Sequence, residues 1–300
     1  MPPLGQLELT GDIQGVHDPD IIEADGVFYL FSTGNGIQLR TSDDLTSWQF
    51  QGRVFDTVPS WITTTAASEP DNLWAPEIAR FNGLYHLYYS ASSFGSQQSC
   101  IGHATRASLT EGEWEDDGQA VICSLVGSDY NAIDPSPVMV SGGQPKLYFG
   151  SFWGGIYVID LDAEGKRSGD DVTSVARRPG GGPIEAANAL YRDGRYYLFT
   201  SFDSCCQGSA STYYVVVNRS DSPLDGFVDE TDFPALSGGG TRVTFPDDRW
   251  VGPGHSSTFA IGDQLYLVHH AYDTFNAGTP TLRIASIAWS ATGWPTLENN

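Results

Sequence analysis

A short apolar and aromatic segment recurs five times along the 300-residue chain, and this repeat limits the possible folds more than any other feature. The copies follow turns that contain Gly or Pro, and they end at residues 31, 89, 149, 199 and 267, which are 58, 60, 50 and 68 residues apart. Aromatic and β-branched residues between Gly and Asp turns are typical of strands. Because helical periodicity is nearly absent, we predict an all-β protein.

A further strand follows most copies, at residues 36–41, 100–105, 155–159, 213–217 and 281–285. A repeat of roughly 50 to 70 residues with three or four strands is typical of a propeller blade. No Pro- or Ser-rich linker divides the chain. We therefore predict one five-bladed β-propeller domain over residues 1–300. A two-sheet sandwich is the alternative, but it does not explain five similar units.

The charge of the chain excludes several classes of partner. Lys and Arg number 15 against 37 Asp and Glu, which gives a formal net charge of −22. Nucleic-acid binding requires clustered basic residues, and so does attraction to anionic membranes, so we expect neither. No apolar run approaches the roughly 20 residues of a transmembrane helix. Closed propellers protect their strand edges, so we expect a monomer.

Composition also bears on the location of the protein. Residues 1–5 lack the basic start and the apolar stretch of a signal peptide. An acidic chain that is poor in Lys and rich in Trp, Tyr and Gly is typical of secreted proteins. We expect an extracellular protein whose signal peptide is absent from this sequence, with a cytosolic protein as the alternative.

The four cysteines allow three pairings. Cys100 and Cys123 stand apart in the sequence, and a disulfide between them is expected in an oxidising compartment. Cys205 and Cys206 are adjacent, which is compatible with either a vicinal disulfide or two thiols. The chain has no Cys-x-x-Cys pair, so we expect no zinc site.

One polar residue lies 12 to 15 residues before the end of each aromatic strand. These residues are Asp18, Glu77, Asp134, Glu185 and His255. In a propeller the first strand of each blade lines the central channel, so equivalent positions converge on the axis. We predict that four carboxylates and one imidazole surround a single mouth.

Separated carboxylates in one pocket indicate glycoside hydrolysis. One carboxylic acid protonates the leaving oxygen, and the other carboxylate activates water or attacks carbon. A third carboxylate can keep the acid protonated by like-charge repulsion. Aromatic side chains supply flat apolar faces for sugar rings. Those that accompany the carboxylates in the sequence are Trp74, Phe94, Phe152 and Trp153.

Nine segments resemble those of a known family, in the same order along the chain. They are HDPDI (17–21), NLWAPE (72–77), SSFGS (92–96), NAIDP (131–135), GSFWGG (150–155), IEA (184–186), SFDSCC (201–206), GPGH (252–255) and HHAYD (269–273). Together they resemble glycoside hydrolase family 43 and, within it, the endo-acting α-1,5-L-arabinanases. The resemblance covers nearly the whole chain.

The resemblance implies a five-bladed propeller that hydrolyses internal α-1,5-L-arabinofuranosidic bonds of linear arabinan with inversion. By position, Asp18 is the general base, Glu185 is the general acid, and Asp134 orients the acid and tunes its pKa. Two segments match those that line the substrate cleft of family members. Their residues are Asn131, Ala132, Ile133, Ser151, Phe152 and Trp153. Inversion predicts a separation of roughly 6.5 to 9.5 Å between the Asp18 and Glu185 carboxyl groups.

Family arabinanases also hold a metal, often calcium, on the axis near the site through a histidine, and His255 matches that residue. Because Ca²⁺ prefers six to eight oxygen ligands, the remaining ligands would be water. We expect no organic cofactor.

Two other classes of function stay open on the sequence alone. One is a family member of different specificity, namely an exo-acting arabinanase, an α-L-arabinofuranosidase or a β-xylosidase. The chain has no large insertion that would close one end of the groove, which favours endo action. The other is a carbohydrate-binding propeller without activity, and the intact set of carboxylates argues against it.

Overall fold

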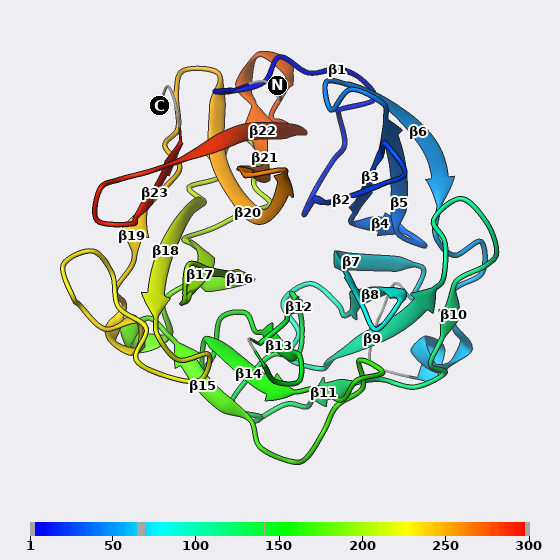
Figure 1. The fold of residues 1–300 in the computed structure, drawn as a ribbon, viewed down its shortest axis with the longest axis horizontal. Coiled ribbons are helices and arrows are strands. Elements are labelled where there is room, and N and C mark those ends of the chain that lie inside the picture. The colour runs from blue at the N-terminus through cyan, green and yellow to red at the C-terminus, as the bar shows by residue number, and fades with distance from the viewer. Residues whose placement is uncertain (1–3, 65–69, 141, 298–300) are drawn as a thin grey trace.

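The computed structural model describes residues 4–64, 70–140 and 142–297 and is a five-bladed β-propeller (Figure 1). Five sheets surround one axis, and the chain visits them in sequence order, except that the short strand β4 (Gly34–Asn35) pairs with blade 2 before β5 and β6 complete blade 1. Within these ranges helical structure is limited to short 3₁₀ turns. They are η1 (Ser60–Thr64), η2 (Pro179–Gly181), η3 (Gly208–Ala210), η4 (Ala235–Ser237) and η5 (Thr274–Asn276). The prediction of an all-β, five-bladed fold is confirmed.

The blades consist of the following strands. Blade 1 contains β1 (Thr10–Gly11), β2 (Asp20–Ala24), β3 (Val27–Ser32), β5 (Gln38–Ser42) and β6 (Ser47–Arg53). Blade 2 contains β4 (Gly34–Asn35), β7 (Asn72–Phe81), β8 (Leu84–Ala91), β9 (Ser99–Arg106), β10 (Glu115–Asp116) and β11 (Ile122–Ser124). Blade 3 contains β12 (Ser136–Val138), β13 (Lys146–Phe149), β14 (Ile156–Asp160) and β15 (Thr173–Ala176). Blade 4 contains β16 (Ile184–Arg192), β17 (Arg195–Phe202), β18 (Tyr214–Ser220) and β19 (Thr241–Arg242). Blade 5 contains β20 (Trp250–Ile261), β21 (Gln264–Asp273), β22 (Thr279–Trp289) and β23 (Pro295–Leu297).

The repeated aromatic segments form the second strand of each blade, and both faces of these strands are buried. On β8, for example, Tyr89 packs in the cluster between blades 1 and 2, and Tyr88 packs in the cluster between blades 2 and 3. On β13, Phe149 and Tyr148 divide in the same way between the two neighbouring interfaces. Strands that are buried on both faces read as continuous apolar runs, which explains the pattern of the repeat.

The N-terminal segment closes the ring between the last blade and the first. The Leu7 N–H donates to the Ile284 carbonyl of β22 (2.9 Å), and Gln14 forms a bridge with Thr281 of the same strand. Between these contacts β1 pairs in parallel with β6 of blade 1. Within blade 2, the expected disulfide between Cys100 and Cys123 joins β9 and β11.

The inner strand of every blade, or the residues just before it, contains one non-glycine residue with a left-handed backbone. These residues are Asp18 (φ 52°), Ala75 (φ 45°), Asp134 (φ 57°), Ala186 (φ 58°) and His255 (φ 49°). In blades 2, 4 and 5 the pairing with the second strand shifts register around this residue. Such bulges redirect side chains, and here they do so beside the axis.

A circle of five hydrogen bonds connects these five left-handed residues. In each case the N–H of the left-handed residue donates to a side chain of the preceding blade. The bonds are Asp18 N–H to His270 Nδ1 (3.2 Å), Ala75 N–H to Thr33 Oγ1 (2.8 Å), Asp134 N–H to Ser90 Oγ (3.0 Å), Ala186 N–H to Asp134 Oδ2 (2.9 Å) and His255 N–H to Ser201 Oγ (2.9 Å). A buried backbone N–H that makes no hydrogen bond within its own sheet needs such a partner. The circle therefore holds the inner ends of all five blades in register.

This circle predicts different effects for two neighbouring buried residues of β17. Ser201→Ala removes the acceptor of the His255 N–H, so we expect a loss of about 1–3 kcal/mol in the free energy of unfolding. Thr200 is equally buried, and its hydroxyl has no partner among the described residues, so Thr200→Val should be close to neutral. Urea unfolding followed by tryptophan fluorescence measures both variants. Equal stabilities of the two variants would contradict a structural role for the circle.

Candidate active site

A cleft of about 530 Å³ lies at the centre of the ring and takes residues from all five blades. It contains nearly every residue that the sequence predicted for the site. They are Asp18, Trp74, Phe94, Asn131, Ile133, Asp134, Ser151, Phe152, Trp153, Glu185 and His255. The bulges bring these residues together from positions more than 230 residues apart in the chain.

One predicted cleft residue lies elsewhere. Ala132 is fully buried in the cluster between blades 2 and 3, and it does not line the cleft. Its neighbours Asn131 and Ile133 face the cleft, whereas Ala132 faces the core. The structure does not place Ala132 in the cleft, because the chain turns at this residue, with the Ile133 N–H donating to the Asn131 carbonyl (3.0 Å), and the Ala132 side chain packs into the core.

Asp18 is held by groups from blades 1 and 5. Its Oδ1 lies 2.7 Å from His17 Nδ1 and 3.0 Å from His255 Nδ1, and its Oδ2 accepts a hydrogen bond from the Thr33 hydroxyl (2.5 Å). Burial favours the neutral acid, but the two imidazoles outweigh it and hold the pKa of Asp18 well below its ordinary value of 3.8. Asp18 is therefore an ionised carboxylate at neutral pH.

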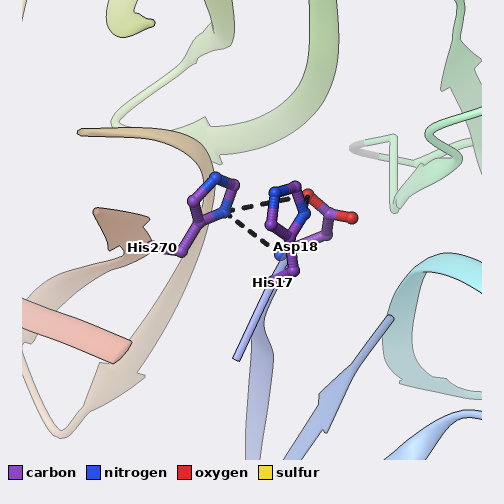
Figure 2. Close-up of side chains that lie close together, drawn as sticks. All are labelled: His17, Asp18 and His270. Carbon is purple, nitrogen blue, oxygen red and sulfur yellow. Dashed lines mark hydrogen bonds and ion pairs between the residues drawn. The ribbon is translucent and has the colours of Figure 1, made fainter. Parts of the chain in front are cut away.

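His17 and His270 form a stacked pair beside Asp18, with ring centroids 3.8 Å apart (Figure 2). The Tyr272 hydroxyl accepts the Cys206 N–H (2.7 Å) and lies 2.8 Å from His17 Nε2. His17 therefore contacts Tyr272 through Nε2 and Asp18 through Nδ1. His270 Nδ1 accepts the Asp18 N–H, and burial holds the pKa of His270 well below 6.5, so this ring is neutral.

His17, Asp18 and His270 are close enough to form a group of potential metal ligands, with ligand atoms within 4.8 Å of one another. Their geometry argues against a metal at this place. Both nitrogens of His17 and Nδ1 of His270 already contact protein groups. The stacked rings are inclined by only 27°, so their in-plane lone pairs run side by side and do not converge.

Glu185 precedes the bulge residue of β16 and points into the cleft from blade 4. Its Oε2 accepts a hydrogen bond from the Ser151 hydroxyl of blade 3 (2.7 Å). Burial raises the pKa of Glu185 above 4.5, and this effect exceeds the opposing effects of the Ser151 hydrogen bond and the His255 charge. The environment therefore favours the protonated acid, in contrast to Asp18.

Asp134 connects the acid to the circle of hydrogen bonds. Its Oδ2 accepts the N–H of Ala186, the residue that follows Glu185. Burial, together with repulsion by Glu185 and Asp18, raises the pKa of Asp134 to about 7. Asp134 thus fixes the backbone beside Glu185, and the charge of Glu185 disfavours ionisation of Asp134.

His255 supplies positive charge among these acids. Burial alone would lower its pKa, but the carboxylates of Asp18, Asp134 and Glu185 raise it to about 9. The imidazole is therefore protonated at neutral pH and balances part of the negative charge of the site. This state results from three carboxyl groups around one ring in a buried environment.

Glu77 does not join the ring of residues at the mouth, contrary to the sequence prediction. Its Oε1 accepts hydrogen bonds from Ser136 (2.7 Å) and Asn188 (2.9 Å), which connects blades 2, 3 and 4. Glu77 lies two residues beyond the bulge at Ala75, and the counterpart of Glu185 in blade 2 is Trp74. Counting residues back from the aromatic strand selected Glu77 in place of Trp74, because the bulges change the register between the two strands.

Aromatic side chains form the open walls of the cleft. Phe94 is 82% exposed and Trp153 is 44% exposed, although both are large and apolar. Trp74 and Phe152 line the same cleft from blades 2 and 3. Exposed rings around buried carboxylates offer stacking faces to a ligand that also carries reactive polar groups.

Thr33 was missed by sequence reasoning, although it contacts both Asp18 and the backbone of Ala75. A signal was present in the repeat. Thr33, Ser151 and Ser201 each stand two residues after the last aromatic residue of their repeat. In the structure these hydroxyls contact Asp18, Glu185 and the His255 backbone, respectively. Asn72, Ser204 and Gln207, which also line the cleft, carry no comparable signal.

Comparison with known proteins identifies the family of this chain. Residues 13–295 match the model of glycosyl hydrolases family 43. The chain is 40% identical over 285 residues to an extracellular endo-α-(1→5)-L-arabinanase of Bacillus subtilis, a match that covers 93% of this chain and 87% of the relative. It is 36% identical over 300 residues to an extracellular exo-α-(1→5)-L-arabinofuranosidase of Cellvibrio japonicus, covering 94% and 86%.

The fold matches as well. The solved structure of a family 43 endo-arabinanase from Bacillus licheniformis superposes with a TM-score of 0.90 at 41% identity, and the match covers 97% of this chain and 99% of that one. The sequence match extends over all five blades. The chain therefore belongs to glycosyl hydrolases family 43.

Proposed function

We propose that this protein is an inverting glycoside hydrolase that cleaves internal α-1,5-L-arabinofuranosidic bonds of linear arabinan, a side chain of pectin. The observation that carries the proposal is the convergence of Asp18, Asp134 and Glu185, from three blades, on one open cleft. Their environments favour one ionised and one protonated carboxyl group, which is the pairing that this chemistry requires. The relatives named endo-arabinanases support the choice of substrate.

The roles of the carboxyl groups follow from their protonation states. Asp18 accepts a proton from a water molecule as the water oxygen bonds to the anomeric carbon. The bond from that carbon to the leaving oxygen breaks, and Glu185 gives its proton to the leaving oxygen. Asp134 is a positioning residue that holds the Ala186 backbone and disfavours early ionisation of Glu185. Exchange with solvent then restores both protonation states.

The walls of the cleft account for substrate binding. The exposed faces of Phe94 and Trp153 offer stacking surfaces for furanose rings, and the half-buried Trp74 and Phe152 line the same cleft. Asn131 and Ser151 supply polar groups near the carboxylates. Asn131 is itself oriented, because its Oδ1 accepts a hydrogen bond from the Ser99 hydroxyl (2.8 Å).

Calcium at His255 is part of the proposal. Three acidic groups, Asp18, Asp134 and Glu185, surround the single positive charge of the His255 imidazole. The excess of acidic groups fits a divalent cation. His255 would hold the ion through an imidazole nitrogen, after loss of the proton that it carries at neutral pH, and water would supply the oxygen ligands. When bound, the ion supplies the positive charge that keeps the neighbouring carboxylate ionised.

Exo action is the second candidate, because relatives of that type match over as much of the chain as the endo-acting ones. The endo reading is preferred for the higher identity to the Bacillus endo-arabinanases and for the open cleft.

We also propose an extracellular location, since two of the relatives are named extracellular. No helix in the described part of the chain is long and apolar enough to span a membrane. The monomeric state stays a prediction.

Substitution of the two reacting carboxyl groups tests the assigned roles. Asp18→Asn and Glu185→Gln keep the shape of each side chain but remove the base or the acid. Each general acid or base contributes about 10²–10⁴-fold to the rate, so we expect kcat on linear arabinan to fall by at least that factor. Reducing-sugar release measures the rate, and circular dichroism checks the fold. A folded variant that keeps a tenth of the activity would contradict the role of the substituted residue.

The pKa directions predict an asymmetric pH profile. Activity requires ionised Asp18 and protonated Glu185, and the pKa of Asp18 is lowered while that of Glu185 is raised. We expect kcat/KM to stay high well below pH 4 and to fall as pH rises through the raised pKa of Glu185. Rates on a soluble arabino-oligosaccharide from pH 3 to pH 9 measure the profile. An alkaline limb at the ordinary glutamate value of 4.5 would contradict a buried acid.

The products from debranched linear arabinan distinguish the two modes of cleavage. Internal cleavage releases a ladder of oligosaccharides from the first minutes, and we expect this ladder by chromatography. A single small product from the start would assign the enzyme to the exo type. Proton NMR of the first products reports the anomeric configuration, and retention of configuration would refute the inverting mechanism.

A further inference from the structure

Cys205 and Cys206 form a vicinal disulfide, and both residues line the substrate cleft on the side of Asp18. The sequence left this pair open between a disulfide and two thiols. Cys206 is exposed and Cys205 is half-buried. The Sγ atom of Cys206 lies 3.8 Å from His17 Nε2, and the other nitrogen of His17 contacts Asp18. His17 therefore lies between the disulfide and Asp18, the proposed general base.

Chain stability does not account for this disulfide. A disulfide stabilises a fold mainly by closing a loop in the unfolded chain, and the effect grows with loop length. Cys205 and Cys206 are one residue apart, so their link closes almost no loop. By contrast, the residues of the Cys100–Cys123 disulfide are 23 apart. The ordinary structural role belongs to that second disulfide.

The loop that carries the pair is already held in place without the sulfur atoms. The Thr212 N–H donates to the Ser204 carbonyl (3.0 Å), and the Gln207 N–H donates to the Ser211 hydroxyl (3.0 Å). The Cys206 N–H donates to the Tyr272 hydroxyl (2.7 Å), which uses only backbone atoms of the cysteine. These backbone bonds, including the one to Tyr272, which also contacts His17, would therefore persist if both side chains were replaced.

The sulfur atoms thus supply a surface. The two sulfur atoms carry no hydrogen-bond donor and are apolar and polarisable, and the Cys206 N–H of the ring is already used by Tyr272. The sulfur face therefore suits the carbon face of a sugar in a cleft otherwise rich in polar groups. The side chains of Phe94 and Trp153 line other parts of the same cleft.

We propose that the ring formed by the Cys205–Cys206 disulfide is a substrate-contacting wall of the cleft, on which a furanose ring packs beside Asp18. This inference rests on the proposed function, because it names a binding surface for that substrate. The wall adds binding energy equally to the ground state and the transition state, so it acts on KM and leaves kcat nearly unchanged.

The test removes the sulfur atoms and keeps the backbone. Cys206 has a left-handed backbone (φ 68°), which glycine adopts without strain, so the double variant Cys205→Ala/Cys206→Gly is suitable. We expect KM for linear arabino-oligosaccharides to rise about tenfold, with kcat within about twofold of the wild type and an unchanged pH profile. The matched control Cys100→Ala/Cys123→Ala removes the other disulfide, and it should lower the melting temperature without changing KM.

Several outcomes would overturn the inference. They are an unchanged KM in the Cys205→Ala/Cys206→Gly variant, a fall in kcat at constant KM, or free thiols at these positions in the wild type by mass spectrometry after alkylation. If that variant does not fold, the Cys100→Ala/Cys123→Ala protein retains a single disulfide, which a phosphine opens in the folded enzyme. KM must then rise on reduction. Failure of the wild type to cleave arabinan would refute the proposed function instead, so the two failures are distinguishable.

Discussion

The circle of five hydrogen bonds between neighbouring blades is the interaction on which the centre of this protein depends. A left-handed residue on each inner strand costs about 1–2 kcal/mol relative to regular backbone, and it also frees an N–H from the sheet ladder. The preceding blade satisfies that N–H with a side chain, in all five cases. The strain is therefore tolerated only in the assembled ring, where it turns Asp18, Asp134 and His255 toward the axis.

The same circle joins structure to chemistry, because four of its members, Asp18, Thr33, Asp134 and His255, also line the cleft. Asp134 accepts the N–H that follows Glu185, His270 accepts the N–H of Asp18, and the His255 N–H closes the link from blade 4 to blade 5. Displacement of one blade would thus alter the positions of both reacting carboxyl groups. Such rigid positioning of reacting groups contributes to catalysis, since the geometry does not have to be reached anew for each substrate.

Two carboxyl groups in one buried cleft differ in protonation because of their partners. Asp18 has two imidazoles and a hydroxyl against its oxygens, and its pKa falls despite burial. Glu185 has the hydroxyls of Ser151 and Tyr213 beside it, whose effects are smaller than that of burial, so its pKa rises. The difference lies in which blade each residue occupies. His17 and His255 come from blades 1 and 5, which meet at Asp18, whereas Glu185 is on blade 4.

The five repeats, their strands and the order of the blades could be predicted from the sequence, because aromatic runs between Gly turns are local properties of the chain. The carboxylates Asp18, Asp134 and Glu185 could be predicted as well, because they stand at similar distances before those runs. Only the tertiary structure decided that Glu77 and Ala132 leave the mouth, that Thr33 joins it, and that Cys205 and Cys206 are paired within the cleft. The physical reason is that a bulge shifts the direction of side chains by one residue, and its partners, such as His270 for Asp18, lie as far as 252 positions away in the sequence.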